Sequence, residues 1–117
     1  SGGSQITVQV ALDPGLMAQA SGEDTVFIFA RAVQGPKMPL AIVRKQVKDL
    51  PLTVTLNDSM AMTPAMVLSN FSEVTVGARV SKSGQAMPRR GDLEGMMSPV
   101  ATGKDSKVEV IINQSVP

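Results

Sequence analysis

Hydrophobic and polar side chains alternate along several short segments of the chain. The clearest is Ile6–Val10, in which every second residue is Ile or Val. Successive side chains of a β-strand point to opposite faces, so this pattern predicts a strand with one buried face. Comparable patterns predict further strands at Leu40–Val47, Leu52–Leu56, Val74–Val80 and Lys107–Ile112.

Other segments depart from simple alternation. Thr25–Val33 is apolar on both faces, which predicts an interior strand with one face on the core and the other under a loop. Asp13 followed by Pro14 predicts one helical turn over Asp13–Ala18, with Asp13 as its N-cap. Gly77 predicts a bulge or a close backbone approach within its strand. We expect Met60–Leu68 to form two short extended pieces and the stretch from Met87 to Pro99, which carries Gly and Pro, to be loop-like.

About seven strands and no long helix predict an all-β domain, an antiparallel Greek-key immunoglobulin-like β-sandwich. A small closed barrel is the alternative. The chain has 117 residues, of which 43% are hydrophobic, enough for one globular domain with its own core. The Gly- and Ser-rich opening predicts a cloning scar or linker at residues 1–5. The sandwich is expected at 6–113 and a C-terminal tail at 114–117.

The composition limits the chemistry, because the chain has no Cys, His, Trp or Tyr. Without Cys and His it lacks the usual transition-metal ligands, thiol nucleophiles and neutral-pH bases. Its net charge is +1 and it has only 3 Phe, so the concentrated basic and aromatic footprint of a nucleic-acid binder is missing. The chain also has no apolar run long enough to span a membrane.

Carboxylates, lysines and hydroxyls are the remaining candidates for catalysis. Asp92 and Glu94 share one strand face, and Glu23 and Asp24 are neighbours in a turn. A glycoside-type mechanism needs two acids that converge in a cleft. We interpret these four as solvent-exposed carboxylates, and we expect no enzyme, no catalytic residue, no metal site and no cofactor.

Methionine is enriched, with 8 in the chain, and Met60 and Met62 lie two residues apart. Thioethers bind Cu(I), and a spacing of two places both on one side of a strand. The alternative is a loop-presented apolar surface for a peptide partner, or core filling. The loop at 34–39 is stiffened by two prolines and would present Lys37 and Met38 as a charged and an apolar tip.

A long string of residues resembles the C-terminal periplasmic domain of the CcmI (CycH) family of cytochrome c biogenesis proteins. The matching runs include Phe27–Arg31, Gly35–Ala41, Val43–Val47, Asp49–Leu56, Asp58–Met62, Leu68–Phe71, Val76–Gly84, Ala86–Pro88 and Gly91–Leu93. Together they cover nearly everything from Ile6 to Ile112. The resemblance implies an immunoglobulin-like module that follows helical repeats in a bacterial inner-membrane protein, with repeats and membrane segments that are absent from this chain.

The resemblance also implies a function, namely a non-catalytic interaction module of a chaperone that presents apocytochrome c to the haem-ligation complex. The expected location is the periplasmic face of the bacterial inner membrane. The expected partners are apocytochrome c, subunits of the ligation complex, or both. The expected contact residues are Arg31, Lys37, Met38, Arg44, Lys45, Met60 and Met62. The alternative function is a periplasmic Cu(I)-binding domain built on Met60 and Met62.

Overall fold

The computed structural model describes residues 5–33, 39–57, 68, 71–82, 91–101 and 106–115. These residues form eight strands and two short 3-10 helices. The strands are β1 (Gln5–Leu12), β2 (Thr25–Ala32), β3 (Pro39–Gln46), β4 (Leu52–Asn57), β5 (Glu73–Ser81), β6 (Leu93–Ala101), β7 (Ser106–Ile112) and β8 (Gln114–Ser115). The helices are η1 (Pro14–Gln19) and η2 (Val47–Asp49).

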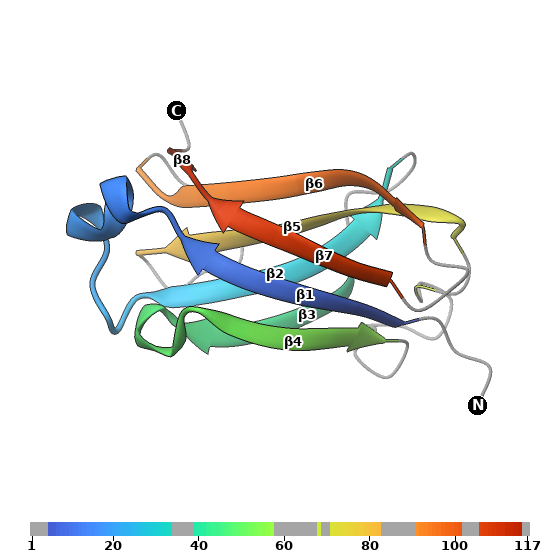
Figure 1. The fold of residues 1–117 in the computed structure, drawn as a ribbon, viewed down its shortest axis with the longest axis horizontal. Coiled ribbons are helices and arrows are strands. Elements are labelled where there is room, and N and C mark those ends of the chain that lie inside the picture. The colour runs from blue at the N-terminus through green and yellow to red at the C-terminus, as the bar shows by residue number, and fades with distance from the viewer. Residues whose placement is uncertain are drawn as a thin grey trace.

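The strands form two sheets that face each other (Figure 1). The small sheet has the order β4-β1-β7 and the large sheet has the order β3-β2-β5-β6-β8. This arrangement confirms the predicted immunoglobulin-like β-sandwich. All the strand pairs are antiparallel except β1 with β7, which is parallel. A parallel pair needs a long connection, and the segment from β2 to β6 provides it.

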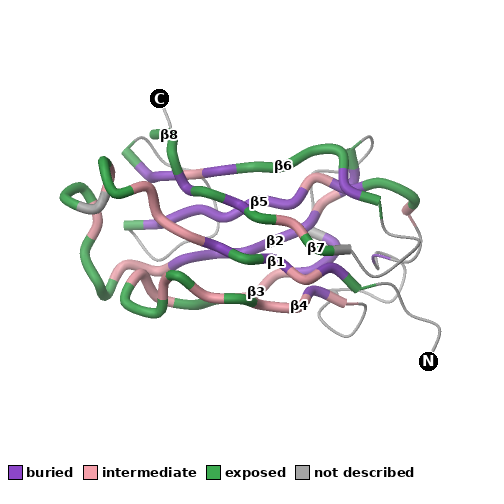
Figure 2. Tube along the Cα trace, viewed as in Figure 1, coloured by how far each residue is buried: buried purple, intermediate pink, exposed green. Residues whose placement is uncertain are grey.

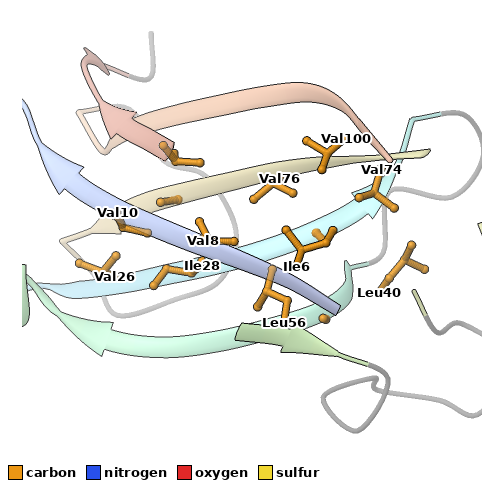
Figure 3. Close-up of a cluster of buried hydrophobic side chains, with 14 of the residues drawn as sticks. Ile6, Val8, Val10, Val26, Ile28, Leu40, Leu56, Val74, Val76 and Val100 are labelled. Carbon is orange, nitrogen blue, oxygen red and sulfur yellow. The ribbon is translucent and has the colours of Figure 1, made fainter. Parts of the chain in front are cut away.

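The core lies between the sheets and is aliphatic. From β1, Ile6 and Val8 have no exposed surface, and from β2 the same holds for Val26 and Ile28. Figure 3 shows these side chains filling one shared layer, and Figure 2 shows the buried positions concentrated on the central strands. The alternation read from the sequence therefore places the correct faces inward.

The main difference from the sequence prediction is β6. The stretch up to Pro99 was expected to be loop-like because Gly and Pro weaken strands. In the structure Gly95 is required within the strand, since a Cβ there would collide with the backbone carbonyl of Ile111 on β7. Pro99 lies at a register shift, where three steps from Met97 to Val100 on β6 match two on β5. The strand thus accommodates both residues.

The remaining predictions concern residues near the start or end of a strand or helix. Asp13 precedes η1 as predicted, and its carboxylate accepts the backbone N–H of Gly15 at 2.8 Å. Gln5, expected in the linker, is the first residue of β1, and the first two residues of the expected tail form β8. The segment expected to be extended over Met60–Leu68 lies outside the described residues, apart from the buried Leu68. In the described part of the chain, no helix is long and apolar enough to cross a membrane.

Candidate functional site

The outer face of the large sheet, which points away from the small sheet, carries the most distinctive group of side chains. Val26, Ile28 and Ala30 of β2 point into the core, so alternation turns the intervening residues outward. Strand register places outward residues of β3, β5 and β6 beside them. We call the group the arginine–phenylalanine face, and its members are Phe27, Phe29, Arg31, Ile42, Arg44, Gly77, Arg79, Glu94 and Met96.

Two rows of directly paired residues cross this face. The first runs over four strands and alternates cation, aromatic ring, cation and carboxylate, in the order Arg44, Phe27, Arg79, Glu94. The second row is apolar, in the order Ile42, Phe29, Gly77, Met96. Directly opposite side chains are the strongest interacting pairs in a sheet, so each row is a contiguous band.

Gly77 creates the space in which the apolar row packs. A Cβ at this position would lie 2.7 Å from Cζ of Phe29 and 3.2 Å from Cγ of Met96. The Phe29 ring therefore lies over the glycine and has only 5% of its surface exposed, although it is outside the core. The atoms that lie close to Gly77 belong to side chains and not to another backbone, and the register shift between β5 and β6 falls between Val74 and Val76, so neither alternative predicted for Gly77 is seen there.

Three arginines surround the two rings. The guanidinium carbon of Arg79 lies 5.7 Å from the centre of the Phe29 ring and that of Arg31 lies 6.0 Å from the same ring. The guanidinium carbon of Arg44 lies 5.9 Å from the centre of the Phe27 ring. Cations at this range are attracted to the negative face of an aromatic ring. The arginines are thereby held in place above the rings.

The three arginines differ in burial. Arg79 is buried, with 7% of its surface exposed, whereas Arg31 is half-buried and Arg44 is exposed. Burial lowers the pKa of Arg79, the nearby carboxylates of Asp92 and Glu94 raise it, and Arg31 lowers it further. The Nε–H group of Arg79 is buried and has no hydrogen-bond acceptor among the residues that the structure describes. Arg79 is thus a structural cation with nearby carboxylates, while the other two present their charge outward.

Asp92 corrects one sequence prediction. It was expected to be exposed, but only 2% of its surface is exposed. One of its carboxylate oxygens accepts the backbone N–H of Lys82 at 3.3 Å, and Arg79 attracts its charge. A buried carboxylate with a donor and a nearby cation needs no catalytic role to explain it. Glu94 is half-buried.

The predicted contact residues divide between the two sides of the sheet. Arg31 and Arg44 lie on the arginine–phenylalanine face, and an Nη–H of Arg31 also approaches the sulfur of Met96 at 3.8 Å. Lys45 pairs with Val26 and is exposed, so it points to the opposite side at the sheet edge. Lys37, Met38, Met60 and Met62 lie outside the described residues, and the Cu(I) hypothesis stays a prediction.

Sequence reasoning missed Arg79, Phe29 and Met96 as members of this surface. The sequence did carry a signal for Arg79. An arginine two residues after a glycine in an interior strand lies on the same face as the glycine, so its side chain can extend over it. The described residues contain no group of three or more His, Cys, Asp or Glu placed to hold a metal ion.

The geometry and core define the chain as an immunoglobulin-like β-sandwich domain with a cation–aromatic outer face. A family model described as "Cytochrome c-type biogenesis protein H Ig-like domain" matches residues 6–113, and the chain belongs to this family. The resemblance read from the sequence is therefore confirmed.

Two known proteins are similar to the chain. The "Cytochrome c-type biogenesis protein CycH" of Pseudomonas aeruginosa is 41% identical over 111 residues, which are 95% of this chain and 27% of that protein. The chain thus spans about a quarter of this relative's length. Among solved structures, an alternative pilotin from the type II secretion system of Vibrio cholerae has a TM-score of 0.55 at 19% identity, with 98% of each chain covered. That likeness concerns the fold alone.

Proposed function

We propose that this chain is a non-catalytic protein-interaction module of a cytochrome c maturation chaperone. In this role it helps present apocytochrome c to the haem-ligation complex, on the periplasmic face of the bacterial inner membrane. Membership of the CycH immunoglobulin-like family supports a role in cytochrome c biogenesis. The observation that carries the module role is the arginine–phenylalanine face, a fixed band of aromatic rings and outward cations.

The residue types in the chain support a positioning role. Cytochrome c maturation handles thiols and haem, and this chain has no Cys and no His. It forms no mixed disulfide with a partner thiol and cannot ligate haem through imidazole. Such a domain can hold a partner while the reactive groups belong to other components.

Arg and aromatic residues also support a binding surface. Arginine is enriched in protein interfaces, where a few such residues supply most of the binding energy, and here the buried rings of Phe27 and Phe29 hold the guanidinium groups in place. On this sandwich they are fixed by packing on one another, so little side-chain entropy is lost when a partner docks.

The test is binding of the purified chain to apocytochrome c and to each subunit of the haem-ligation complex, measured by biolayer interferometry. We expect specific binding to at least one of them. An absence of binding to all of them would refute the interaction role. Titration with Cu(I), followed at the Met methyl resonances, tests the alternative function in the same preparation.

A further inference from the structure

The arginine–phenylalanine face has an unequal distribution of charge. Arg79 lies near two carboxylates, those of Asp92 and Glu94, which raise its pKa. Arg31 and Arg44 have different surroundings, since their described contacts are an aromatic ring each and, for Arg31, the Met96 sulfur. Neither contact neutralises a positive charge. Two cations on this face are therefore available to a carboxylate from outside.

The surface between these two cations is apolar. Ile42 and Phe29 lie between them on β3 and β2, and Met96 of β6, with 41% of its surface exposed, continues the same apolar row across Gly77. Arg44 pairs with Phe27, which is four residues before Arg31 on the same strand. Four residues of a β-strand span about 13 Å. Arg44 lies one strand spacing further, on β3, so the backbone positions of the two arginines are about 14 Å apart on a diagonal that crosses the apolar row.

We infer that the arginine–phenylalanine face binds an extended polypeptide segment that carries two carboxylates four residues apart with an apolar side chain between them. The carboxylates would pair with Arg31 and Arg44, and the apolar side chain would lie between them against Ile42 and Phe29. The inference deepens the proposed function and rests on it, because it assigns the surface and the chemistry of the partner.

Pre-organisation favours this site over a pair of free surface arginines. Each guanidinium already lies against a ring, and the Phe29 ring is fixed by its contact with Gly77. The planar guanidinium forms bidentate hydrogen bonds with a carboxylate, which a lysine cannot do. Exposed ion pairs are weak individually, so we expect millimolar affinity for a short peptide and a strong dependence on salt.

The test uses the pentapeptide acetyl-Glu-Thr-Leu-Thr-Glu-amide, titrated into the isotopically labelled 117-residue chain and followed by NMR. In an extended peptide the two Glu and the Leu share one face, with the required spacing. We expect shifts at the Nε–H groups of Arg31 and Arg44 and at the Met96 methyl group. The peptide acetyl-Thr-Glu-Leu-Glu-Thr-amide has the same composition but places its carboxylates on the face opposite Leu, and it should bind more weakly.

Protein variants complete the test. The double substitution Arg31→Gln and Arg44→Gln should weaken binding of the first peptide about tenfold. The matched control is Lys45→Gln, which removes the cation next to Arg44 but on the other side of the sheet. Equal affinity for both peptides, shifts confined to the small sheet, or an equal effect of the two protein changes would each overturn the inference. If the chain binds apocytochrome c while the peptide test fails, the proposed function stands and this surface assignment falls.

Discussion

The ring of Phe29 occupies the space directly over Gly77, so that a Cβ on residue 77 would lie 2.7 Å from the ring atom Cζ. The two residues are direct partners on β2 and β5. Their contact fixes the ring on which the arginine–phenylalanine face is built, because both Arg31 and Arg79 lie against that ring. The stability of the face therefore depends on a residue that has no side chain of its own.

The first prediction concerns Gly77→Ala. The added methyl group forces the Phe29 ring to move, and overpacking of this kind costs about 1–3 kcal/mol of unfolding free energy. Urea denaturation measures the change. Gly22→Ala is the matched control, because its Cβ would meet Lys48 Cβ at an ordinary 3.5 Å. Equal losses for the two variants would contradict the account.

A second substitution identifies the cause of that loss. Phe29→Leu removes the ring atoms that the new methyl group would strike. In the Phe29→Leu background, Gly77→Ala should therefore cost less than it does in the unchanged chain, which a double-mutant cycle detects as a coupling of about 1 kcal/mol. Additive effects would show that the ring is not the obstacle.

Gly95→Ala should be the most harmful of the glycine substitutions. Its Cβ would strike the Ile111 carbonyl, which is backbone and cannot rotate away as a ring can. We expect a loss greater than that of Gly77→Ala, with the order Gly95, Gly77, Gly22 from most to least harmful. The same urea series measures all three, and a smaller loss at Gly95 than at Gly77 would contradict the geometry.

The sequence pattern predicts most of the sandwich because alternation reports burial directly. Ile6, Val8 and Val10 lie in the core as the alternation requires, and the doubly apolar β2 is an interior strand. The pattern fails at β6, since Gly95 and Pro99 weaken an isolated strand. The β7 backbone packs against Gly95 and leaves no room for a side chain there. The local sequence gives no sign of this contact.

Arg79, a buried cation near carboxylates, should contribute more to the free energy of unfolding than Arg31, which presents its charge outward. Removing a buried charge whose counter-charge remains buried costs about 3 kcal/mol. Arg79→Met should therefore destabilise the chain by roughly that amount, because Asp92 stays buried without its nearby cation. Adding Asp92→Asn should restore part of the loss. Arg31→Gln, which removes a half-buried cation from the same ring, should cost no more than about 1 kcal/mol, as chemical denaturation can show.

The turn before η1 provides an independent prediction. Asp13 Oδ1 accepts the N–H of Gly15 at 2.8 Å, so Asp13→Ala leaves that donor without its protein partner. Loss of a helix cap costs about 1 kcal/mol, while Asp13→Asn retains an acceptor and should cost much less. Thermal unfolding of both variants checks the difference, and identical melting temperatures would contradict the cap.

The candidate site was only partly predictable. Arg31 and Arg44 were singled out as contact residues, and strand register places both on one face, but it places the neighbouring Lys45 on the other. Charge along the chain cannot separate Arg44 from Lys45, since the separation depends on which strand face is buried. Arg79 and Met96 join the site only through pairing of β2, β5 and β6, which are distant in sequence.

The most direct test of the central claim is the affinity of the chain for apocytochrome c and the subunits of the haem-ligation complex, with and without the available arginines. We predict that the chain and its Lys45→Gln variant bind at least one of these proteins with the same Kd. The double variant Arg31→Gln and Arg44→Gln should bind that protein about tenfold more weakly. Absence of binding by the unchanged chain to every one of these proteins would contradict the account.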